Sequence, residues 1–463
     1  LIKDYKKDLN ERNIQPLSDD YIKFIRYAEH FIEKNKTGIV AMITNNSFID
    51  GITHRQMRKH LLETFDEIYV LDLHGNSKKK ETAPDGSKDE NVFDIMQGVA
   101  ISIMIKKNID SKIQTSEVSK TSEVLQSSQK KLGTVYHSEL FGTRDKKFIK
   151  LAESNIENIK WKKLNYKDPY YFFVPKDFST NDEYEKGFKV DDLFPISNSG
   201  LKTDRDSLFI DIERVSLEKR FQILLANKYD EKFKQEFRIV NSGSYNIIEK
   251  LKNKYFNNKY IQSLQYRPFD YRWIYYDPFL ISRPADKVMS HLVDKNNVAV
   301  ITSRQFGGGK HFIFFCTKML CEISSQPFAP YTLFPLFLYS EDGTKAPNLK
   351  TEIVQEIEKI VGKTQPEEIL DYIYAVLHSP AYRKKYKEFL KIDFPRVPYP
   401  KDKKTFKALV ALGTELRLLH LLESPKVNQF ITTFPIEGNG EVEKIKFETK
   451  NIVISTEGRN LNS

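Results

Sequence analysis

The feature that most constrains the fold is an alternation of helical and extended patterns over the first hundred residues. Residues 20–34 and 53–64 repeat apolar side chains with the helical period, whereas 38–43, 67–73 and 99–106 are short apolar runs rich in β-forming residues. Strands fed by helices in this order are typical of an α/β unit. We therefore predict an α/β domain with a mainly parallel sheet.

Polar residues follow the first apolar run directly, in the stretch AMITNNSFIDG at 41–51. Residues 44–47 (Thr-Asn-Asn-Ser) suit a helix-capping turn, because such side chains readily bond to nearby backbone groups. They equally suit the ligand-facing end of a strand, where open α/β sheets bind their ligands. The polar loop at 74–98 follows another predicted strand, and loops of that length are usually functional or mobile.

The composition indicates a globular protein with two or three domains, since 463 residues are 40% hydrophobic and 29% charged. No apolar run approaches the roughly 20 residues of a membrane span, and the charged first residues show no signal peptide. The two cysteines, Cys316 and Cys321, have poor spacing for zinc. We predict buried structural cysteines, no metal site and a reducing compartment, the cytoplasm.

The net charge is +10 and the isoelectric point is about 9.0. A basic surplus favours polyanions, because lysine and arginine release counterions from phosphate backbones. Aromatic residues make up 13% of the chain and supply either stacking surfaces or core side chains. These properties favour nucleic acid as a partner without identifying it.

The composition changes after residue 107, where TSEVSKTSEVLQSSQKK repeats TSEV and lacks bulky apolar residues. We interpret 108–132 as a low-complexity insertion or linker. Beyond it, 170–174 and 297–305 have the pattern of strands, and two later segments, 366–379 and 404–423, have the pattern of helices.

Common catalytic motifs are absent from the sequence: there is no Walker A loop, HExxH, G-x-S-x-G or G-x-G-x-x-G. The Gly-rich stretch FGGGKH at 306–311 lacks P-loop spacing and predicts a flexible hairpin. Function must therefore be sought in longer blocks of sequence.

Such blocks resemble a known family. The succession DDYIKFIRYAEHFIEK, GIVAMITNNSFIDG, EIYVLDLHGN and NVFDIMQGVAISIMIK is similar to the second half of adenine-specific DNA methyltransferases. The resemblance is to the branch fused into single-polypeptide restriction–modification enzymes of the type ISP or type IIG kind. GLKTDRD (200–206), RPFDYRWIYYD (267–277), HSPAYRKKYKEFLKIDFPRVPYP (378–400) and FPIEGN (434–439) resemble its target-recognition domain.

This resemblance implies the domain organisation. Residues 1–107 would form the C-terminal half of a Rossmann-like methyltransferase sheet, 108–132 a linker, and 133–463 a mixed α+β target-recognition domain that could be truncated at its C-terminus. The implied partner is double-stranded DNA, and no membrane is implied. An upstream part of the same polypeptide would carry the rest of the methyltransferase and any nuclease or translocase.

The resemblance also implies a pocket for a flipped adenine and for S-adenosylmethionine. Phe93 matches the aromatic residue that stacks on the extruded base, although a core phenylalanine is the alternative. Phe24 matches a helix position beside the cofactor, and its helical stripe is equally that of a core residue. The pocket would also be lined by the residues after the first strand, namely Asn45, Asn46, Ser47 and Phe48.

The same family carries an Asn-Pro-Pro-Tyr-type tetrapeptide that desolvates and orients the adenine amine. No Pro-Pro dipeptide exists in this sequence, and the family's order places that motif upstream of residue 20. Leu1 therefore looks like a cut just after the motif, and the chain alone is not expected to methylate. Two alternatives remain open, a non-catalytic DNA-binding specificity module and, less favoured, an RNA methyltransferase.

DNA contacts are predicted for basic residues in polar or aromatic stretches, where arginine could read guanine and lysine could hold phosphate. A solvated or ion-paired side chain is the alternative for each of them. The residues are Lys78, Lys79, Lys80, Lys202, Arg205, Arg267, Arg272, Arg283 and Arg304.

Overall fold

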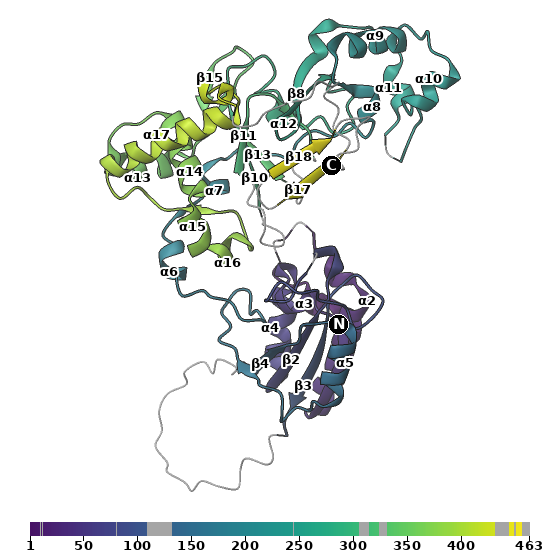
Figure 1. Ribbon diagram of the computed structural model, residues 1–463, viewed down its shortest axis with the longest axis vertical. Coiled ribbons are helices and arrows are strands. Elements are labelled where there is room, and N and C mark those ends of the chain that lie inside the picture. The colour runs from purple at the N-terminus through teal and green to yellow at the C-terminus, as the bar shows by residue number, and fades with distance from the viewer. Residues whose placement is uncertain are drawn as a thin grey trace. The chain divides into compact units, whose positions relative to one another are not determined.

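The computed structural model describes residues 1–9, 11, 13–79, 81–108, 132–243, 245–304, 314–323 and 331–430, and the backbone of two strands at Lys444–Glu448 and Asn451–Ser455. The chain forms two compact units, and in Figure 1 residues 1–184 of the first are coloured purple to blue, whereas its segment 385–393 is yellow-green. Among the described residues, unit 1 contains 1–184 and 385–393, and unit 2 contains 185–304, 314–384 and the residues from 394 onward.

Unit 1 is built on a five-stranded sheet with the order β1-β3-β2-β4-β5. The strands are β1 (Gly38–Asn45), β2 (Glu67–His74), β3 (Val99–Lys106), β4 (Thr134–Glu139) and β5 (Lys162–Lys163). β3 is antiparallel to both β1 and β2, which therefore run in the same direction, and β4 is parallel to β2. The three sequence-predicted strands are thereby confirmed.

The prediction of a mainly parallel sheet was wrong. Only the β2–β4 pairing is parallel, whereas the pairings of β3 with β1, of β3 with β2 and of β4 with β5 are antiparallel. Parallel neighbours need a crossover, usually a helix. The described part of the connection from β2 to β3 contains only a short 3₁₀ turn at Ser77–Lys79, so β3 returns beside β2 in the opposite direction.

Helices pack on the sheet of unit 1 through apolar side chains repeated at the helical period. In α2 (Asp20–Asn35), Ile22, Ile25 and Ile32 are buried, and α4 (Arg55–Thr64) buries Met57, Leu61 and Leu62. Gly38 lets α2 and β1 approach closely, because a Cβ at this position would lie 2.7 Å from Ile32 Cδ1. The remaining helices are α1 (Ile2–Tyr5), η1 (Gln15–Ser18), α3 (Ser47–Asp50), η2 (Ile52–His54), α5 (Arg144–Ala152), α6 (Asn181–Tyr184) and α16 (Lys387–Leu390).

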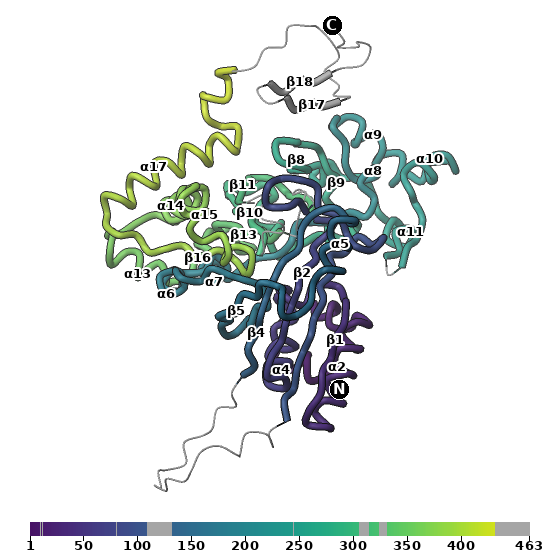
Figure 2. Tube along the Cα trace, turned by 60° about the horizontal axis from the view of Figure 1, so that its bottom comes forward, coloured from purple at the N-terminus to yellow at the C-terminus, as the bar shows by residue number. Residues whose placement is uncertain are grey.

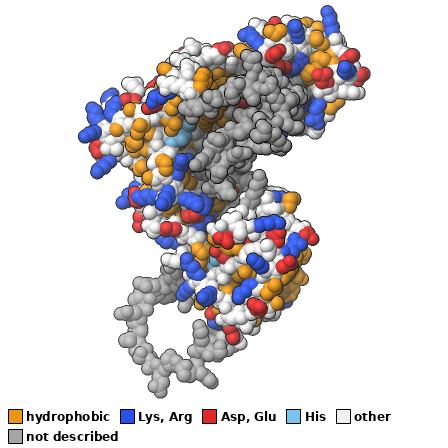
Figure 3. Space-filling model, in the orientation of Figure 1, with side chains coloured by type: hydrophobic (Ala, Val, Ile, Leu, Met, Phe, Trp, Pro, Cys, Tyr) orange, Lys and Arg blue, Asp and Glu red, His pale blue; other side chains and the backbone are white. Residues whose placement is uncertain are grey.

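β1 is an edge strand of the described sheet, and apolar side chains stay exposed around it. Figure 2 shows α2 beside β1. The exposed residues are Phe24, Tyr27 and Phe31 of α2 and Ile39 and Ile43 of β1. Hydrophobic side chains gather on the side of unit 1 that carries α2 (Figure 3).

Unit 2 contains several small sheets around a large apolar core. One sheet has the order β12-β8-β9-β7, another β11-β10-β13, and pairs are formed by β14 with β15, β16 with β6 and β17 with β18. Their bounds are β6 (Phe188–Lys189), β7 (Ile210–Asp211), β8 (Ile261–Arg267), β9 (Asp270–Tyr275), β10 (Ala299–Ser303), β11 (Phe314–Thr317), β12 (Leu320–Cys321), β13 (Tyr331–Pro335), β14 (Phe337–Tyr339), β15 (Lys345–Pro347), β16 (Arg396–Val397), β17 (Lys444–Glu448) and β18 (Asn451–Ser455).

Two long helices of unit 2 confirm the predictions from helical periodicity: α14 (Pro366–His378) and α17 (Lys403–His420) pack against each other. Gly413 permits this contact, because a Cβ there would lie 1.8 Å from the Asp371 carbonyl oxygen. The other helices are α7 (Val190–Leu193), α8 (Asp206–Phe209), α9 (Arg214–Leu225), α10 (Glu231–Glu236), α11 (Ile247–Leu251), η5 (Asn258–Tyr260), α12 (Asp286–Met289), α13 (Thr351–Val361), α15 (Pro380–Lys385) and η7 (Pro425–Asn428).

Two further sequence predictions can be compared with the structure. The run YYFFV at 170–174 is not a strand: Tyr171 has a left-handed φ of 48°, which interrupts an extended conformation, although residues 171–173 are buried. Cys316 and Cys321 are buried and free, as predicted. No helix among the described residues is long and apolar enough to cross a membrane.

Candidate functional site

Three strands of unit 1 end at the same edge of the sheet. β1, β2 and β4 run in the same direction, so Asn45, His74 and Glu139 lie at their carboxyl ends. The loop 75–98 leaves this edge after β2 and returns to it at the start of β3. Open α/β sheets bind ligands at the carboxyl ends of their strands, which makes this edge the candidate site.

Asn45 and Asn46 use their side chains differently. The Asn45 Oδ1 atom accepts hydrogen bonds from the Ser47 backbone N–H at 2.9 Å and from the Ser47 hydroxyl at 2.7 Å. The Asn46 amide instead donates to Asp72 Oδ1 at 2.9 Å, near the end of β2, which β3 separates from β1 in the sheet. The Asn45 side chain thus forms a local turn with Ser47, whereas Asn46, the N-cap residue of α3, joins the ends of β1 and β2.

Gly98 closes the loop against Asn46. The Asn46 N–H donates to the Gly98 carbonyl oxygen at 3.0 Å, and a Cβ at residue 98 would lie 2.7 Å from Asn46 Nδ2. A side chain at residue 98 would therefore push the Asn46 amide out of its hydrogen bond with Asp72. The contact places the last residues of the loop directly beside the Asn46–Asp72 pair.

His74 occupies an acidic environment at the end of β2. Its Nδ1 atom lies 3.0 Å from a Glu81 carboxylate oxygen, and its Nε2 lies 3.7 Å from a Glu139 oxygen. Burial disfavours the imidazolium, but the contacts with Glu139 and Glu81 and the charge of Asp72 outweigh it and raise the pKa of His74 to about 9. His74 also stacks on Phe141, with ring centroids 3.8 Å apart.

The carboxylates around His74 respond in opposite directions. Burial raises the pKa of Asp72 above its usual value. Contact with His74 lowers the pKa of Glu139, and for Glu81 it overcomes the opposing effect of burial and lowers the pKa as well. The cluster therefore favours a charged imidazole beside ionised glutamates at neutral pH.

The loop 75–98 is fastened to α5 by a buried ion pair. Lys147 Nζ lies 2.8 Å from Asp89 Oδ1, and both side chains are inaccessible to solvent. The Asp89 carboxylate also accepts hydrogen bonds from the backbone N–H groups of Gly75 at 2.7 Å and Gly142 at 2.8 Å. Lys147 donates to two carbonyl oxygens, those of Leu73 and Glu90, each at 2.7 Å.

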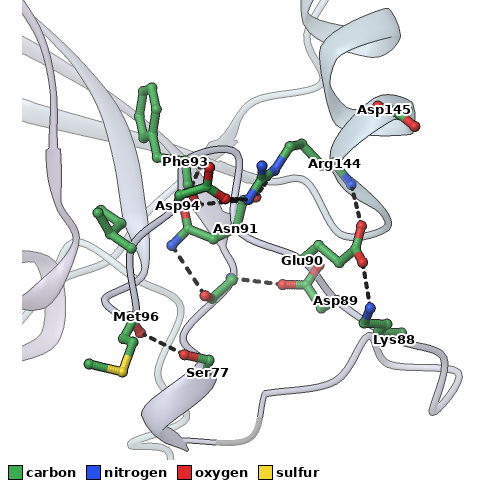
Figure 4. A pocket seen from close by; sticks show the side chains of 12 residues that line it. Ser77, Lys88, Asp89, Glu90, Asn91, Phe93, Asp94, Met96, Arg144 and Asp145 are labelled. Atoms are coloured by element: carbon green, nitrogen blue, oxygen red, sulfur yellow. Dashed lines mark hydrogen bonds and ion pairs between the residues drawn. The ribbon is translucent and has the colours of Figure 1, made fainter.

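A cavity of about 680 Å³ lies along this loop and includes Phe93 in its lining. Arg144 at the start of α5 fixes the loop residues that line the cavity. Its guanidinium donates to the Asn91 carbonyl at 2.8 Å and pairs with Asp94 at 2.7 Å. The ring of Phe93 points away from these contacts (Figure 4). Phe93, Ile95 and Met96 are about half exposed and offer an apolar surface.

The structure places Phe93 and Asn46 at the candidate site and Phe48 in the core. Phe93 lines the cavity, and Asn46 lies beside the end of its loop. Phe48 is completely buried and packs on Tyr21 and Phe173, so its side chain belongs to the core and lines no exposed pocket. Phe24 is 65% exposed on α2, outside the core in which its stripe would have placed it.

Sequence reasoning missed the groups that hold the site in shape: Asp72, His74, Asp89, Arg144 and Lys147. Asp72 and His74 carried a usable signal, since they are polar residues at the end of a predicted apolar strand. Asp89 and its partner Lys147 are far apart in sequence, and no local pattern links them. Among the predicted basic residues of the loop, Lys78 and Lys79 are exposed, and Lys80 lies outside the described residues.

In unit 2, Arg205 supports the fold. It is 4% exposed, donates to the carbonyl oxygens of Arg238 and Val240, and lies over the ring of Tyr245. These contacts use the guanidinium inside the protein, in conflict with the predicted DNA contact.

Four of the other predicted basic residues of unit 2 form two pairs. Arg267 and Arg272 both lie over the ring of Tyr266, at 3.9 and 4.0 Å from its centroid, and pair with Glu322 and Asp270 respectively. Lys202 exchanges two backbone hydrogen bonds with Arg283 and pairs with Asp204. Arg304 follows β10 and is exposed.

The sequence profile described as the Type ISP C-terminal specificity domain matches residues 192–460. The chain belongs to this family. The Type ISP match begins in α7 and covers most of unit 2, including Lys202, Arg267 and Arg283. Unit 1, with Phe93 and His74, lies almost wholly outside it.

Solved structures resemble the chain beyond the Type ISP match. The ATP-dependent Type ISP restriction-modification enzyme LlaBIII bound to DNA has a TM-score of 0.70 and 24% identity over 98% of this chain. A nuclease-deletion mutant of the Type ISP enzyme LlaGI with a DNA substrate mimic has a TM-score of 0.68 and 22% identity over 98%. The DrdV–DNA complex has a TM-score of 0.68 and 23% identity over 90%.

These likenesses concern the fold. The chain spans less than half of the matched chains, 30% of LlaBIII, 42% of LlaGI and 41% of DrdV. No curated protein matches the sequence. The Type ISP specificity family is therefore established, and the chemistry of the whole enzyme is a separate question.

Proposed function

We propose that the chain recognises double-stranded DNA and supplies part of the base and cofactor pocket of an enzyme that methylates the N6 amine of adenine. The observation that carries the proposal is the match of residues 192–460 to the Type ISP specificity domain. The similar structures of LlaBIII, LlaGI and DrdV were obtained with DNA or a DNA substrate mimic, which supports DNA as the partner. The net charge of +10 is of the sign that phosphate backbones attract.

The Phe93 cavity supports a role in holding an extruded base. Flipping a base out of the duplex costs a few kcal/mol, and stacking on an aromatic ring can return roughly 1–3 kcal/mol. The Phe93 ring is exposed, whereas its backbone is fixed: the Phe93 N–H donates to the Asn91 side chain, and Arg144 donates to the Asn91 carbonyl. Polar groups of Asn46 and Asp72 lie beside the end of the same loop.

The free edge of the sheet supports an upstream partner in the same polypeptide. β1 pairs with β3 on one side, and among the described residues nothing pairs with its other side. Ile39 and Ile43 of β1 and Phe24 of α2 are exposed beside this edge. Further strands would pair with the free backbone edge of β1 and extend the sheet toward a complete Rossmann-like methyltransferase domain, and helices packed on the extended sheet would cover Ile39 and Ile43.

S-adenosylmethionine is the cofactor that we propose for the complete enzyme, where it would supply the methyl group. Phe24 fits such a ligand, because its ring is 65% exposed on α2 and can pack against an adenine ring. Asn45 fits less well, because its oxygen is already used by Ser47. The chain by itself is not expected to transfer a methyl group.

The alternative is a specificity module without any catalytic contribution. The two basic groups around Tyr266 and Lys202–Arg283 belong to unit 2 and would serve either function. We favour the cytoplasm as the compartment, because the two free cysteines are compatible with a reducing environment.

The proposal is tested by titrating this chain with a labelled random-sequence duplex over a series of salt concentrations, in parallel with S-adenosylmethionine. We expect DNA binding with a steep salt dependence and little cofactor binding. Arg283→Gln should reduce the salt slope by roughly one, whereas Lys219→Gln on α9 provides an exposed control of equal charge change. Absence of DNA binding at low salt would overturn the proposed function.

A further inference from the structure

A second cavity of unit 1, of about 560 Å³, shares no lining residue with the Phe93 cavity. It is formed by the segment from Lys162 to Phe178 and by Glu388 of α16. The segment begins in β5, where Lys162 and Lys163 pair with the backbone of β4, and continues as irregular chain to α6. None of the roles described above uses this cavity.

Four lysines line the cavity: Lys162, Lys163, Lys167 and Lys176. Lys176 lies 3.4 Å from a Glu388 carboxylate oxygen, and Asp177 is the only other acidic residue in the lining. In the part of the chain that the structure describes, Lys162, Lys163 and Lys167 take part in no ion pair. The lining therefore has a surplus of positive charge that an anion could neutralise.

The rings of Phe172 and Phe178 lie beside these ammonium groups and form an aromatic wall of the cavity. Phe172 is almost completely buried and stacks on Phe178, with ring centroids 6.1 Å apart. The Arg58 guanidinium lies 5.0 Å from the Phe172 ring centroid, and Lys176 Nζ lies 5.3 Å from it. Arg58 is itself fixed by hydrogen bonds to three carbonyl oxygens, those of Phe48, Gly51 and Tyr170.

Positive charge next to an apolar wall suits a ligand that joins a phosphate to a planar base. Such a ligand satisfies the lysines through its phosphate oxygens, and the aromatic wall covers its base or sugar. A carboxylate or sulfate alone would leave the exposed part of Phe178 in contact with water. Phe172 and Phe178 are held in the fold, so little ordering is needed when the ligand binds.

We propose that this cavity binds phosphate groups of a nucleotide unit, with the neighbouring base or sugar against the partly exposed ring of Phe178, which Phe172 supports from inside the fold. The inference rests on the proposed function, because a DNA strand is the source that we favour. A free nucleotide offers the same chemistry and is the other source. In either case the cavity is a second nucleic-acid-type site in unit 1, separate from the one that contains Phe93.

The experiment compares three triple variants of the full chain. K162Q/K163Q/K167Q removes the unpaired charges, K162R/K163R/K167R keeps them, and K3Q/K7Q/K34Q removes the same charge from exposed positions elsewhere in unit 1. The affinity for a labelled random-sequence duplex is measured at several KCl concentrations. Circular dichroism and thermal unfolding show whether each variant is folded.

The glutamine variant in the cavity should lower the slope of log K against log salt by roughly 2–3, because each lost phosphate contact contributes about 0.9. The arginine variant should keep the wild-type slope, and the K3Q/K7Q/K34Q control should leave it nearly unchanged. Equal slopes for the two glutamine variants, together with equal nucleotide binding, would overturn the inference while leaving the proposed function intact. A wild-type chain that binds no DNA would instead remove the proposed function.

A second titration distinguishes the sources of phosphate. A fluorescent nucleoside triphosphate is added to the same variants without divalent cations. Loss of its binding in K162Q/K163Q/K167Q, with an unchanged DNA slope, supports the cavity as a site for free nucleotides. Loss of the DNA slope without any nucleotide binding supports the DNA strand.

Discussion

Phe93 is the residue whose role is most directly tested. Its ring is 44% exposed, so Phe93→Ala should change stability by less than about 1 kcal/mol. We expect it to weaken binding to a duplex that contains an adenine opposite an abasic site by roughly 5- to 150-fold, the equivalent of 1–3 kcal/mol of stacking. Binding to the fully paired duplex should change less.

Ile95→Ala is the matched control for Phe93, since Ile95 lines the same cavity and is similarly exposed. It removes apolar surface without removing a stacking face. Equal losses for the two variants would show that the cavity offers general apolar contact and that no base stacks on Phe93.

His74 predicts a pH dependence of stability. Its pKa is raised from 6.5 to about 9 in the folded protein, so the protonated ring stabilises the fold. That contribution is complete below about pH 6.5 and disappears as the pH rises through 9. The difference corresponds to about 3 kcal/mol at most. The groups that face the ring are Asp72, Glu81, Glu139 and His137.

Unfolding by urea at pH 6 and pH 9.5 measures this effect. His74→Gln should flatten the loss of stability between the two pH values, because a neutral amide cannot gain a proton there. Glu139→Gln should flatten it partly, since Glu139 is one of the groups that raise the pKa of His74. Wild-type and His74→Gln curves that run parallel would contradict the assignment.

At the scale of elements, sequence periodicity located the helices and strands well and their orientation poorly. The runs at 38–43, 67–73 and 99–106 are strands, because short apolar runs of β-forming residues have few other ways to be buried. Whether β3 runs parallel or antiparallel to β2 depends on the connection between them. That connection has no periodic pattern of apolar residues from which its course could be predicted. YYFFV was misassigned because a buried aromatic run can also be irregular chain.

The candidate site was predictable only where its residues follow strands. Asn45 and Asn46 stood out because they directly follow an apolar run, whereas Phe93 was predicted only from the family resemblance. The Asp89–Lys147 pair could not be foreseen, since α5 is separated from the loop by β3, the 109–131 segment and β4. Such contacts arise from tertiary packing, which cannot be predicted from the local patterns of a single sequence.

The Asp89–Lys147 pair should govern the order of the loop 75–98. Asp89→Asn leaves the buried Lys147 ammonium without its counter-charge and should cost about 3–5 kcal/mol. Hydrogen exchange should then accelerate in the loop and at the start of α5. Asp94→Asn is the control, because the Asp94 side chain is exposed and its pair with Arg144 is worth about 0–1 kcal/mol. Similar effects of both variants would contradict this role.

At the scale of the whole molecule, the compact units do not follow the predicted domains. The predicted boundary at 108–132 separates β3 from β4, yet β4 pairs with β2 in the same sheet. Unit 1 continues to Tyr184 and also takes in 385–393, from late in the chain. A low-complexity segment can interrupt a domain as well as end one, and β3 and β4 on either side of 109–131 belong to the same sheet.

The segment 385–393 gives the last prediction, that the stability of unit 1 depends on a residue near the end of the chain. Phe389 of α16 is buried, with its ring centroid 4.5 Å from that of Tyr184 and 5.2 Å from that of Phe178. Phe389→Ala should therefore destabilise unit 1 by about 3 kcal/mol through lost burial and the cavity left behind. Phe430→Ala, which alters a largely exposed side chain, should change stability by less than about 0.5 kcal/mol.

Hydrogen exchange resolved by mass spectrometry can locate the effect of Phe389→Ala. Protection should fall first in Asn181–Tyr184 and Lys387–Leu390, which belong to unit 1. The strand Ala299–Ser303, which is fully buried in unit 2, should keep its protection, because no apolar contact of its own is removed. If β10 lost protection as much as α6 did, the chain would unfold as one cooperative block, and the division into two compact units would have no energetic counterpart.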